Sequence, residues 1–347
     1  MTAAQQLIDA AVDRIGLVRL RRAGSILLAA WFAYWVYRTV SVLIHNRVPV
    51  GQDIRIYYRA ARLWLDGGDP WAASIHVGHG IFSFAGSPAT VLVLAPGAAV
   101  LSENRFVALW LVLSAAAAIL TVRLLRLPWW WLLFPPSVEA LYSCNPQLAI
   151  LALLLVGRGR FGGWADTIAV ALKAYAFIPL LGERTIRRLI AAAGLTLASV
   201  LVVPGLWISY VQSLGEISAR IAKESELGYS AFYFPALLLP VAIVLGILWL
   251  RDRHTAAWLA VPAVWPSSEF HYSTMALPVM TPILAVLLAV PIQRLPPVAI
   301  FIDVSWRLAR PHAMRLISKL PPTIHEVQDA SGPDAPADGT PKPPGPD

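Results

Sequence analysis

The sequence predicts an all-α, polytopic membrane protein, and three observations lead to that fold class. The 347 residues are 57% hydrophobic and 14% charged, with a mean hydropathy of +0.62, whereas soluble domains carry about 25% charged residues. Apolar runs of about 20 residues, long enough for a helix to cross the hydrocarbon core, recur along the chain. These runs are rich in Leu and Ala and lack the period-two alternation of barrel strands. We therefore expect a bundle of about ten transmembrane helices, some of them short or broken.

The N-terminal part predicts an uncleaved membrane anchor. Residues 1–23 form an amphipathic segment with several arginines, and no small-residue cleavage site follows it. The first span covers residues 24–44. Because basic residues favour the cytoplasmic side, the N-terminus should lie inside and residues 45–87 should form a first outer loop.

The transmembrane domain is expected over residues 24–292, with a second outer loop at 209–231 that contains an interfacial helix. Residues 293–320 carry arginines and a lysine, which predicts a cytoplasmic segment. Residues 321–347 are rich in Pro, Asp and Gly and are expected to be disordered. The other expected spans and broken segments are residues 87–101, 106–125, 128–160, 162–181, 189–208, 232–250, 256–264 and 273–290.

The first outer loop begins with an aspartate and a short amphipathic pattern. Apolar and aromatic residues recur at helical spacing over residues 54–66, which predicts a helix lying in the membrane interface. Arg55, Arg59 and Arg62 fall on a neighbouring face, and Arg62 is placed to pair with Asp66. Asp53 stands just before this helix, where it is either an N-cap or a functional carboxylate.

Lys173 interrupts the apolar segment at 162–181. A charge inside the bilayer is unfavourable, so an intramembrane lysine is a functional candidate. The alternative is that its side chain extends from a short helix end to the interface. An ammonium facing a cavity is suited to hold a phosphate.

His271 and Glu269 occur together in a polar outer segment, "SSEFHY". His271 is therefore either a structural histidine or part of the same site as Asp53. Glu139 lies near the Pro135-Pro136 break, where it either lines the same cavity or pairs with an arginine. Trp129–Trp131 fit an aromatic belt at the interface.

Several classes of protein and site are excluded. Cys144 is the only cysteine, so no disulfide or cysteine-based metal cluster is expected. His45, His76, His79 and His254 lack ligand spacing on a common face, and neither a metal site nor a cofactor is predicted. Nucleotide-binding loops and metalloprotease motifs are missing from the sequence. The net charge of +8 is spread over loops and tails, which indicates membrane orientation and not nucleic-acid binding.

Four segments together resemble the polyprenyl-phosphate-mannose-dependent mannosyltransferases, glycosyltransferase family 87 of the GT-C superfamily. Asp53 followed by "IYYRAARLWLDGGDPW" is similar to the family's signature after its first helix. The other similar segments, in family order, are "FSFAGSPATVLVLAPGAAV", "AVALKAYAFIPLL" and "SSEFHYSTMALPVM". The chain departs from the family at Trp71, where tyrosine is usual, and at Asn145–Gln147, where Gly-Gln is common.

The resemblance implies a GT-C-like helix bundle and an inverting hexosyltransferase, most simply an α-mannosyltransferase. The enzyme would take a sugar from a polyprenyl-phosphate donor and pass it to a lipid-linked or cell-envelope glycan acceptor. It would sit in the plasma membrane with both termini cytoplasmic and the active site on the extracytoplasmic face. Its partners would be donor, acceptor and membrane lipids.

The resemblance also implies the residue roles. Asp53 would be the catalytic base, and Lys173, Arg55 and Arg59 would bind the donor phosphate. Residues implied in substrate binding are His271, Tyr57, Tyr58, Glu269 and Gln147.

Two other functions remain open at this point. A transporter or lipid flippase would use Lys173 and Glu139 to line a pathway, although such a protein should distribute charge through the depth of the bundle. A structural scaffold gives no reason for an intramembrane lysine. The same chemistry with another sugar, such as arabinofuranose, is also open.

Overall fold

A computed structural model describes residues 16–317 apart from residues 73, 160–161, 184, 225–227, 233 and 267. The predicted disordered tail at 321–347 and most of the predicted N-terminal segment lie outside the described residues. The chain divides into a compact unit of residues 23–308 and a second unit formed by residues 1–22 and 309–347. All candidate site residues belong to the first unit.

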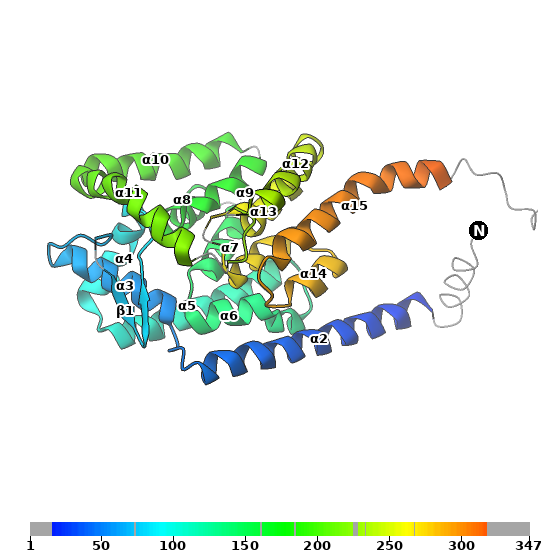
Figure 1. Ribbon diagram of the computed structural model, residues 1–347, viewed down its shortest axis with the longest axis horizontal. Coiled ribbons are helices and arrows are strands. Elements are labelled where there is room, and N and C mark those ends of the chain that lie inside the picture. The colour runs from blue at the N-terminus through cyan, green and yellow to red at the C-terminus, as the bar shows by residue number, and fades with distance from the viewer. Residues whose placement is uncertain are drawn as a thin grey trace, which may run out of the picture. The chain divides into compact units, whose positions relative to one another are not determined.

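The described chain is mostly helical, as predicted (Figure 1). Its first half contains α2 (Leu17–His45), α3 (Gln52–Leu65), β1 (Ile75–Val77), β2 (Gly80–Phe82), α4 (Pro88–Val100), α5 (Glu103–Leu124), η1 (Trp129–Leu133), α6 (Pro135–Ser143), α7 (Gln147–Val156) and α8 (Gly162–Leu172). Its second half contains η2 (Ala174–Ala176), α9 (Phe177–Gly182), α10 (Ile186–Val202), α11 (Pro204–Glu224), α12 (Pro235–Arg251), α13 (Arg253–Val264), η4 (Phe270–Val279), α14 (Pro282–Leu288) and α15 (Leu295–Ile317).

Among the described residues, α2 and α5 are long and apolar enough to cross a membrane. Two further candidates arise if each bent helix pair is one span: α6 with α7, bent by 113°, and α10 with α11, bent by 103°. The described part of the chain therefore has two to four candidate spans, and the predicted number of about ten is not confirmed. Many expected spans are shorter than a bilayer crossing because proline or polar residues end them early.

The break predicted inside residues 128–160 is confirmed, and a second break lies inside residues 162–181. Between α6 and α7 the chain turns at Cys144, whose φ of 51° lies in the left-handed region, and at Asn145-Pro146. Lys173 has extended φ and ψ of −154° and 129°, and it separates α8 from η2 and α9. Two polar residues, Asn145 and Lys173, therefore stand at helix breaks within apolar surroundings.

The amphipathic helix predicted after the first span is α3, which buries Ile54, Ile56, Ala60 and Ala61. It packs against α4 and β1 (Figure 1). The antiparallel hairpin of β1 and β2 is an addition that the sequence analysis did not predict. The N-cap of α3 is Gly51, in a left-handed conformation with φ of 75°, so the N-cap alternative for Asp53 is wrong. Asp53 lies within the first turn of the helix.

Two late segments also differ from expectation. Residues 273–290 were expected to form one span, but a 3-10 helix (η4) and the short α14 replace it, because Pro278 and Pro282 interrupt the segment. The helix expected in the second outer loop is α11, which begins earlier, at Pro204. Because η4 packs against α6, α7 and α13, it carries His271 and Tyr272 into the core.

Candidate functional site

Asn145 connects the two residues that the sequence analysis placed first. Its amide Nδ2 donates to Asp53 Oδ2 at 2.7 Å, and Lys173 Nζ donates to its Oδ1 at 3.3 Å. The same Oδ1 accepts the backbone N–H of Gln147 at 3.1 Å, which fixes the orientation of the amide. The turn between α6 and α7 thus brings a carboxylate from α3 and an ammonium from the α8–η2 break to one side chain.

The Lys173 ammonium is surrounded by tyrosine rings. Its Nζ donates to the Tyr272 hydroxyl at 2.9 Å and lies 4.7 Å from the centroid of that ring. It also lies 5.8 Å from the Tyr175 centroid and 5.9 Å from the Tyr57 centroid, within range of cation–π attraction. The ammonium has three hydrogens, and Asn145 Oδ1 and the Tyr272 hydroxyl accept two of them, while the Tyr57 hydroxyl also interacts with the ammonium.

Tyr57 joins this group, whereas Tyr58 is engaged elsewhere. Desolvation raises the pKa of Tyr57 to about 12 despite the opposing charge of Lys173, so its hydroxyl keeps its proton. The Tyr58 hydroxyl donates to the carbonyl of Leu101 at 2.9 Å, a contact that holds α3 to the connection between α4 and α5. Gln147 is fully buried, and its Oε1 accepts from the Tyr175 hydroxyl. The predicted substrate-binding roles of these residues stay predictions.

Arg55 and Arg59 pair with an acid that sequence reasoning did not single out. Arg55 Nη1 lies 2.6 Å from Glu103 Oε1, and Arg59 Nε lies 2.9 Å from Glu103 Oε2. Arg59 also donates to the carbonyl of His76. Among the described residues neither arginine hydrogen-bonds or ion-pairs with Asp53 or Lys173, so their predicted phosphate-binding role would require these pairs to rearrange.

His271 lies at the start of η4 and is fully buried. Its Nδ1 is 2.8 Å from Glu139 Oε2 and 3.7 Å from Glu269 Oε2. Burial lowers the pKa of His271, so the imidazole is neutral at pH 7. Of the alternatives for Glu139, the described structure shows contact with His271 and no pairing with an arginine.

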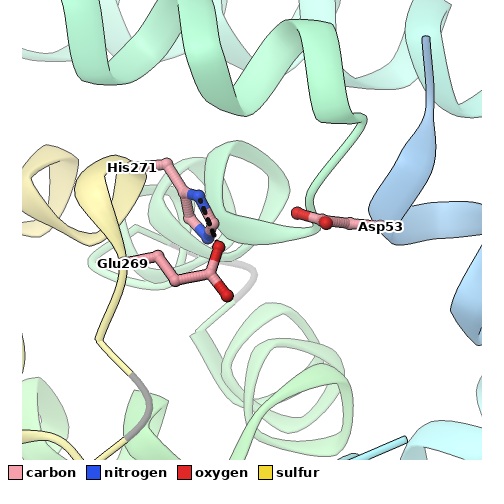
Figure 2. Close-up of side chains that lie close together, drawn as sticks. All are labelled: Asp53, Glu269 and His271. Atoms are coloured by element: carbon pink, nitrogen blue, oxygen red, sulfur yellow. Dashed lines mark ion pairs between the residues drawn. The ribbon is translucent and has the colours of Figure 1, made fainter. Parts of the chain in front are cut away.

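Asp53, Glu269 and His271 converge from two parts of the chain. Figure 2 shows the Asp53 carboxylate pointing from α3 toward the His271 ring, with the Glu269 carboxylate beside that ring. One donor atom from each residue lies within 4.8 Å of the other two. The Glu269 side chain is 64% exposed, so this group of donors extends from the buried imidazole to the protein surface.

Sequence reasoning missed Asn145 and Tyr272 as site residues. Both carried a signal: Asn145 precedes a proline inside an apolar stretch, and Tyr272 follows the singled-out histidine. Their contacts join residues far apart in the chain, which spacing along the sequence does not predict.

No family model, curated protein or solved structure matches this chain.

Proposed function

We propose that this chain is an integral-membrane, inverting glycosyltransferase that uses a polyprenyl-phosphate sugar. The observation that carries the proposal is the link from Asp53 through Asn145 to Lys173. It joins a carboxylate and an ammonium through one amide at the end of an amphipathic helix. A base and a cation are the two groups that would assist transfer from a sugar phosphate to a hydroxyl.

Asp53 acts as the general base. The acceptor hydroxyl oxygen attacks the anomeric carbon of the sugar and forms a new C–O bond, while its proton passes to the Asp53 carboxylate. The bond between the anomeric carbon and the phosphate oxygen breaks, and its electron pair stays on the polyprenyl phosphate. Attack from the face opposite the phosphate inverts the anomeric configuration. A phosphate leaving group needs no general acid, so one carboxylate suffices.

Lys173 stabilises the leaving phosphate. Charge develops on the phosphate oxygen as the bond breaks, and a preorganised cation in poorly hydrated surroundings stabilises such charge strongly. The tyrosine rings and the Asn145 amide hold the ammonium in place, which limits its reorganisation during the reaction.

The resemblance adds mannose as the sugar and a lipid-linked or cell-envelope glycan as the acceptor. It also adds the extracytoplasmic face as the side of reaction. The apolar helices α2 and α5 and the interfacial character of α3 support a site near the headgroups, where a polyprenyl phosphate would present its sugar.

The test compares membranes that contain wild type, Asp53→Asn or Asp66→Asn, each supplied with radiolabelled polyprenyl-phosphate mannose. Asp53→Asn keeps the shape and removes the base, so transfer to lipid-linked product should fall by about a hundredfold or more. Asp66→Asn is the matched control at the other end of α3: its partner is the exposed Arg62, and transfer should equal wild type.

Equal transfer by wild type and Asp53→Asn would refute the base assignment. If wild type transfers neither mannose nor arabinofuranose from a polyprenyl-phosphate donor, the glycosyltransferase proposal fails and the transporter or flippase alternative gains support.

A further inference from the structure

The three donors shown in Figure 2 form a set that suits a metal ion. A carboxylate oxygen from Asp53, another from Glu269 and a ring nitrogen from His271 all lie within 4.8 Å of one another. Metal–oxygen and metal–nitrogen bonds of about 2.1 Å place the ligands of one cation about 3 to 3.5 Å apart. Small side-chain rotations would bring the three donor atoms to that spacing, and the Glu269 side chain can rotate because it is largely exposed.

The second observation is the buried Nε2 of His271. Among the described residues it has no hydrogen-bond partner, although the side chain is fully buried. Buried polar atoms are almost always paired, so an orphaned ring nitrogen indicates a missing partner. In Figure 2 the His271 ring extends toward the carboxylates of Glu269 and Asp53.

The third observation is the Glu139 carboxylate, which contacts Nδ1 of His271. Glu139 Oε2 lies 2.8 Å from Nδ1. In the tautomer in which Nδ1–H donates to Glu139, Nε2 carries the free lone pair. Histidines that ligate metals usually donate their other ring hydrogen to a carboxylate or carbonyl, which fixes the tautomer and orients the ring. The Glu139–His271 pair has that arrangement.

We propose that Asp53, Glu269 and His271 bind one divalent transition-metal ion. One imidazole with two carboxylates suits Mn²⁺ or Zn²⁺ better than Mg²⁺ or Ca²⁺, which prefer all-oxygen ligands. The role of the ion, to share the donor phosphate with Lys173, rests on the proposed function. A carboxylate offers about four lone-pair sites, so Asp53 has room for Asn145, the ion and the acceptor proton.

Mn²⁺ alone is the probe for the binding test. The full-length protein, purified in detergent and stripped with EDTA, is titrated with Mn²⁺ while electron paramagnetic resonance reports the free ion. Wild type should bind one Mn²⁺ per chain. His271→Ala and Glu269→Gln should each weaken binding at least about tenfold, and Glu139→Gln, which acts through His271, by about tenfold to a hundredfold.

His79→Ala, an exposed histidine of the β1–β2 turn, is the matched control and should bind as wild type does. The Glu269 side chain is largely exposed, so Glu269→Gln should fold and still tests the site if His271→Ala misfolds. Absence of stoichiometric Mn²⁺ and Zn²⁺ binding in wild type, or unchanged affinity in both His271→Ala and Glu269→Gln, would overturn the inference.

The binding test and the transfer test fail separately because the titration contains no sugar donor. Mn²⁺ binding without transfer would leave the metal site in place and reject the glycosyltransferase. Transfer that survives EDTA, in a protein that binds no Mn²⁺ or Zn²⁺, would keep the glycosyltransferase and reject the metal site.

Discussion

Asn145 owes its position to the proline that follows it. The residue before a proline is disfavoured in the helical conformation, so α6 ends at Ser143 and the chain turns through Cys144. Asn145 is 4% exposed and is therefore held among helices, where an amide makes strong hydrogen bonds. One residue thus fixes both the Asp53 carboxylate and the Lys173 ammonium.

Replacing Asn145 by alanine should impair transfer without unfolding the protein. The change removes the hydrogen bonds to Asp53 and Lys173 and leaves both charged groups free to reorient. Because small misplacements of reacting groups cost up to about a hundredfold in rate, we expect kcat to fall by about tenfold to a hundredfold. Radiolabelled transfer with a titration of donor concentration measures kcat and KM separately.

Asn46→Ala is the control for this change, since Asn46 is exposed at the end of the first span. Wild-type kcat in Asn145→Ala, with the protein folded, would mean that this amide does not position the reacting groups.

At the scale of elements, a second ionic group holds α7, α8 and α10 together away from the candidate site. Arg188 of α10 pairs with Asp166 of α8, and Arg188 Nη2 donates to the carbonyl of Leu154 in α7 at 3.0 Å. Asp166 is fully buried, and the side chain of Arg188 is 8% exposed. Removing one partner of a buried ion pair is strongly destabilising. We therefore expect an added group that displaces Asp166 or Arg188 to lower the stability of the protein.

Gly157→Ala should lower the thermal stability of the protein. A Cβ at position 157 would contact the Asp166 carboxylate and lie 2.7 Å from Arg188 Nη2, so the ion pair would have to shift. Overpacking of this kind costs about 1–3 kcal/mol. Thermal unfolding of the detergent-purified variants, followed by loss of the monodisperse chromatographic peak, measures the effect.

Gly194→Ala is the matched control in α10, because no atom lies within 4 Å of the added Cβ. Alanine is also the better helix former. If both variants unfold at the wild-type temperature, the packing around Asp166 and Arg188 tolerates a methyl group and the predicted sensitivity is wrong.

Short-range sequence patterns predicted the helices and helix breaks that are determined by residues close together in the chain. The amphipathic spacing at 54–66 predicted α3, and the prolines near 135 and 146 predicted a broken segment. Hydropathy alone does not distinguish a buried 3-10 segment such as η4 from a spanning helix, and the predicted number of about ten crossings is not confirmed. The sequence also picked Asp53, Lys173, Glu269 and His271 as polar residues in unusual places.

The contacts of those residues were not predictable in the same way. Asn145 and Asp53 are 92 residues apart, and Glu139 and His271 are 132 residues apart. Such pairs depend on how helices pack, which spacing along one element does not specify. The histidine spacing along the chain predicted no metal site, and such spacing does not report on donors that distant segments bring together, such as Asp53, Glu269 and His271.

At the scale of the whole molecule, the distribution of arginines sets the expected orientation in the membrane. Arg251 and Arg253 flank the break between α12 and α13, and Arg19, Arg21 and Arg22 lie in the first turns of α2. Basic loops favour the cytoplasmic side, so these segments should lie inside and the β1–β2 hairpin after α2 should lie outside. The proposed chemistry needs that orientation, because α3 and Asp53 follow α2 directly.

Single-cysteine labelling tests this orientation. In a Cys144→Ala background, which removes the only native cysteine, His79→Cys should react with a membrane-impermeant maleimide in intact cells. Arg253→Cys should react only after the membrane is permeabilised, and both positions are exposed, so reactivity reports sidedness and not burial. Labelling of position 253 in intact cells, with position 79 protected, would place the Asp53 site on the cytoplasmic face. A polyprenyl-phosphate donor presented from outside could not then reach it, and the extracytoplasmic reaction would have to be abandoned even if Asp53 proved essential.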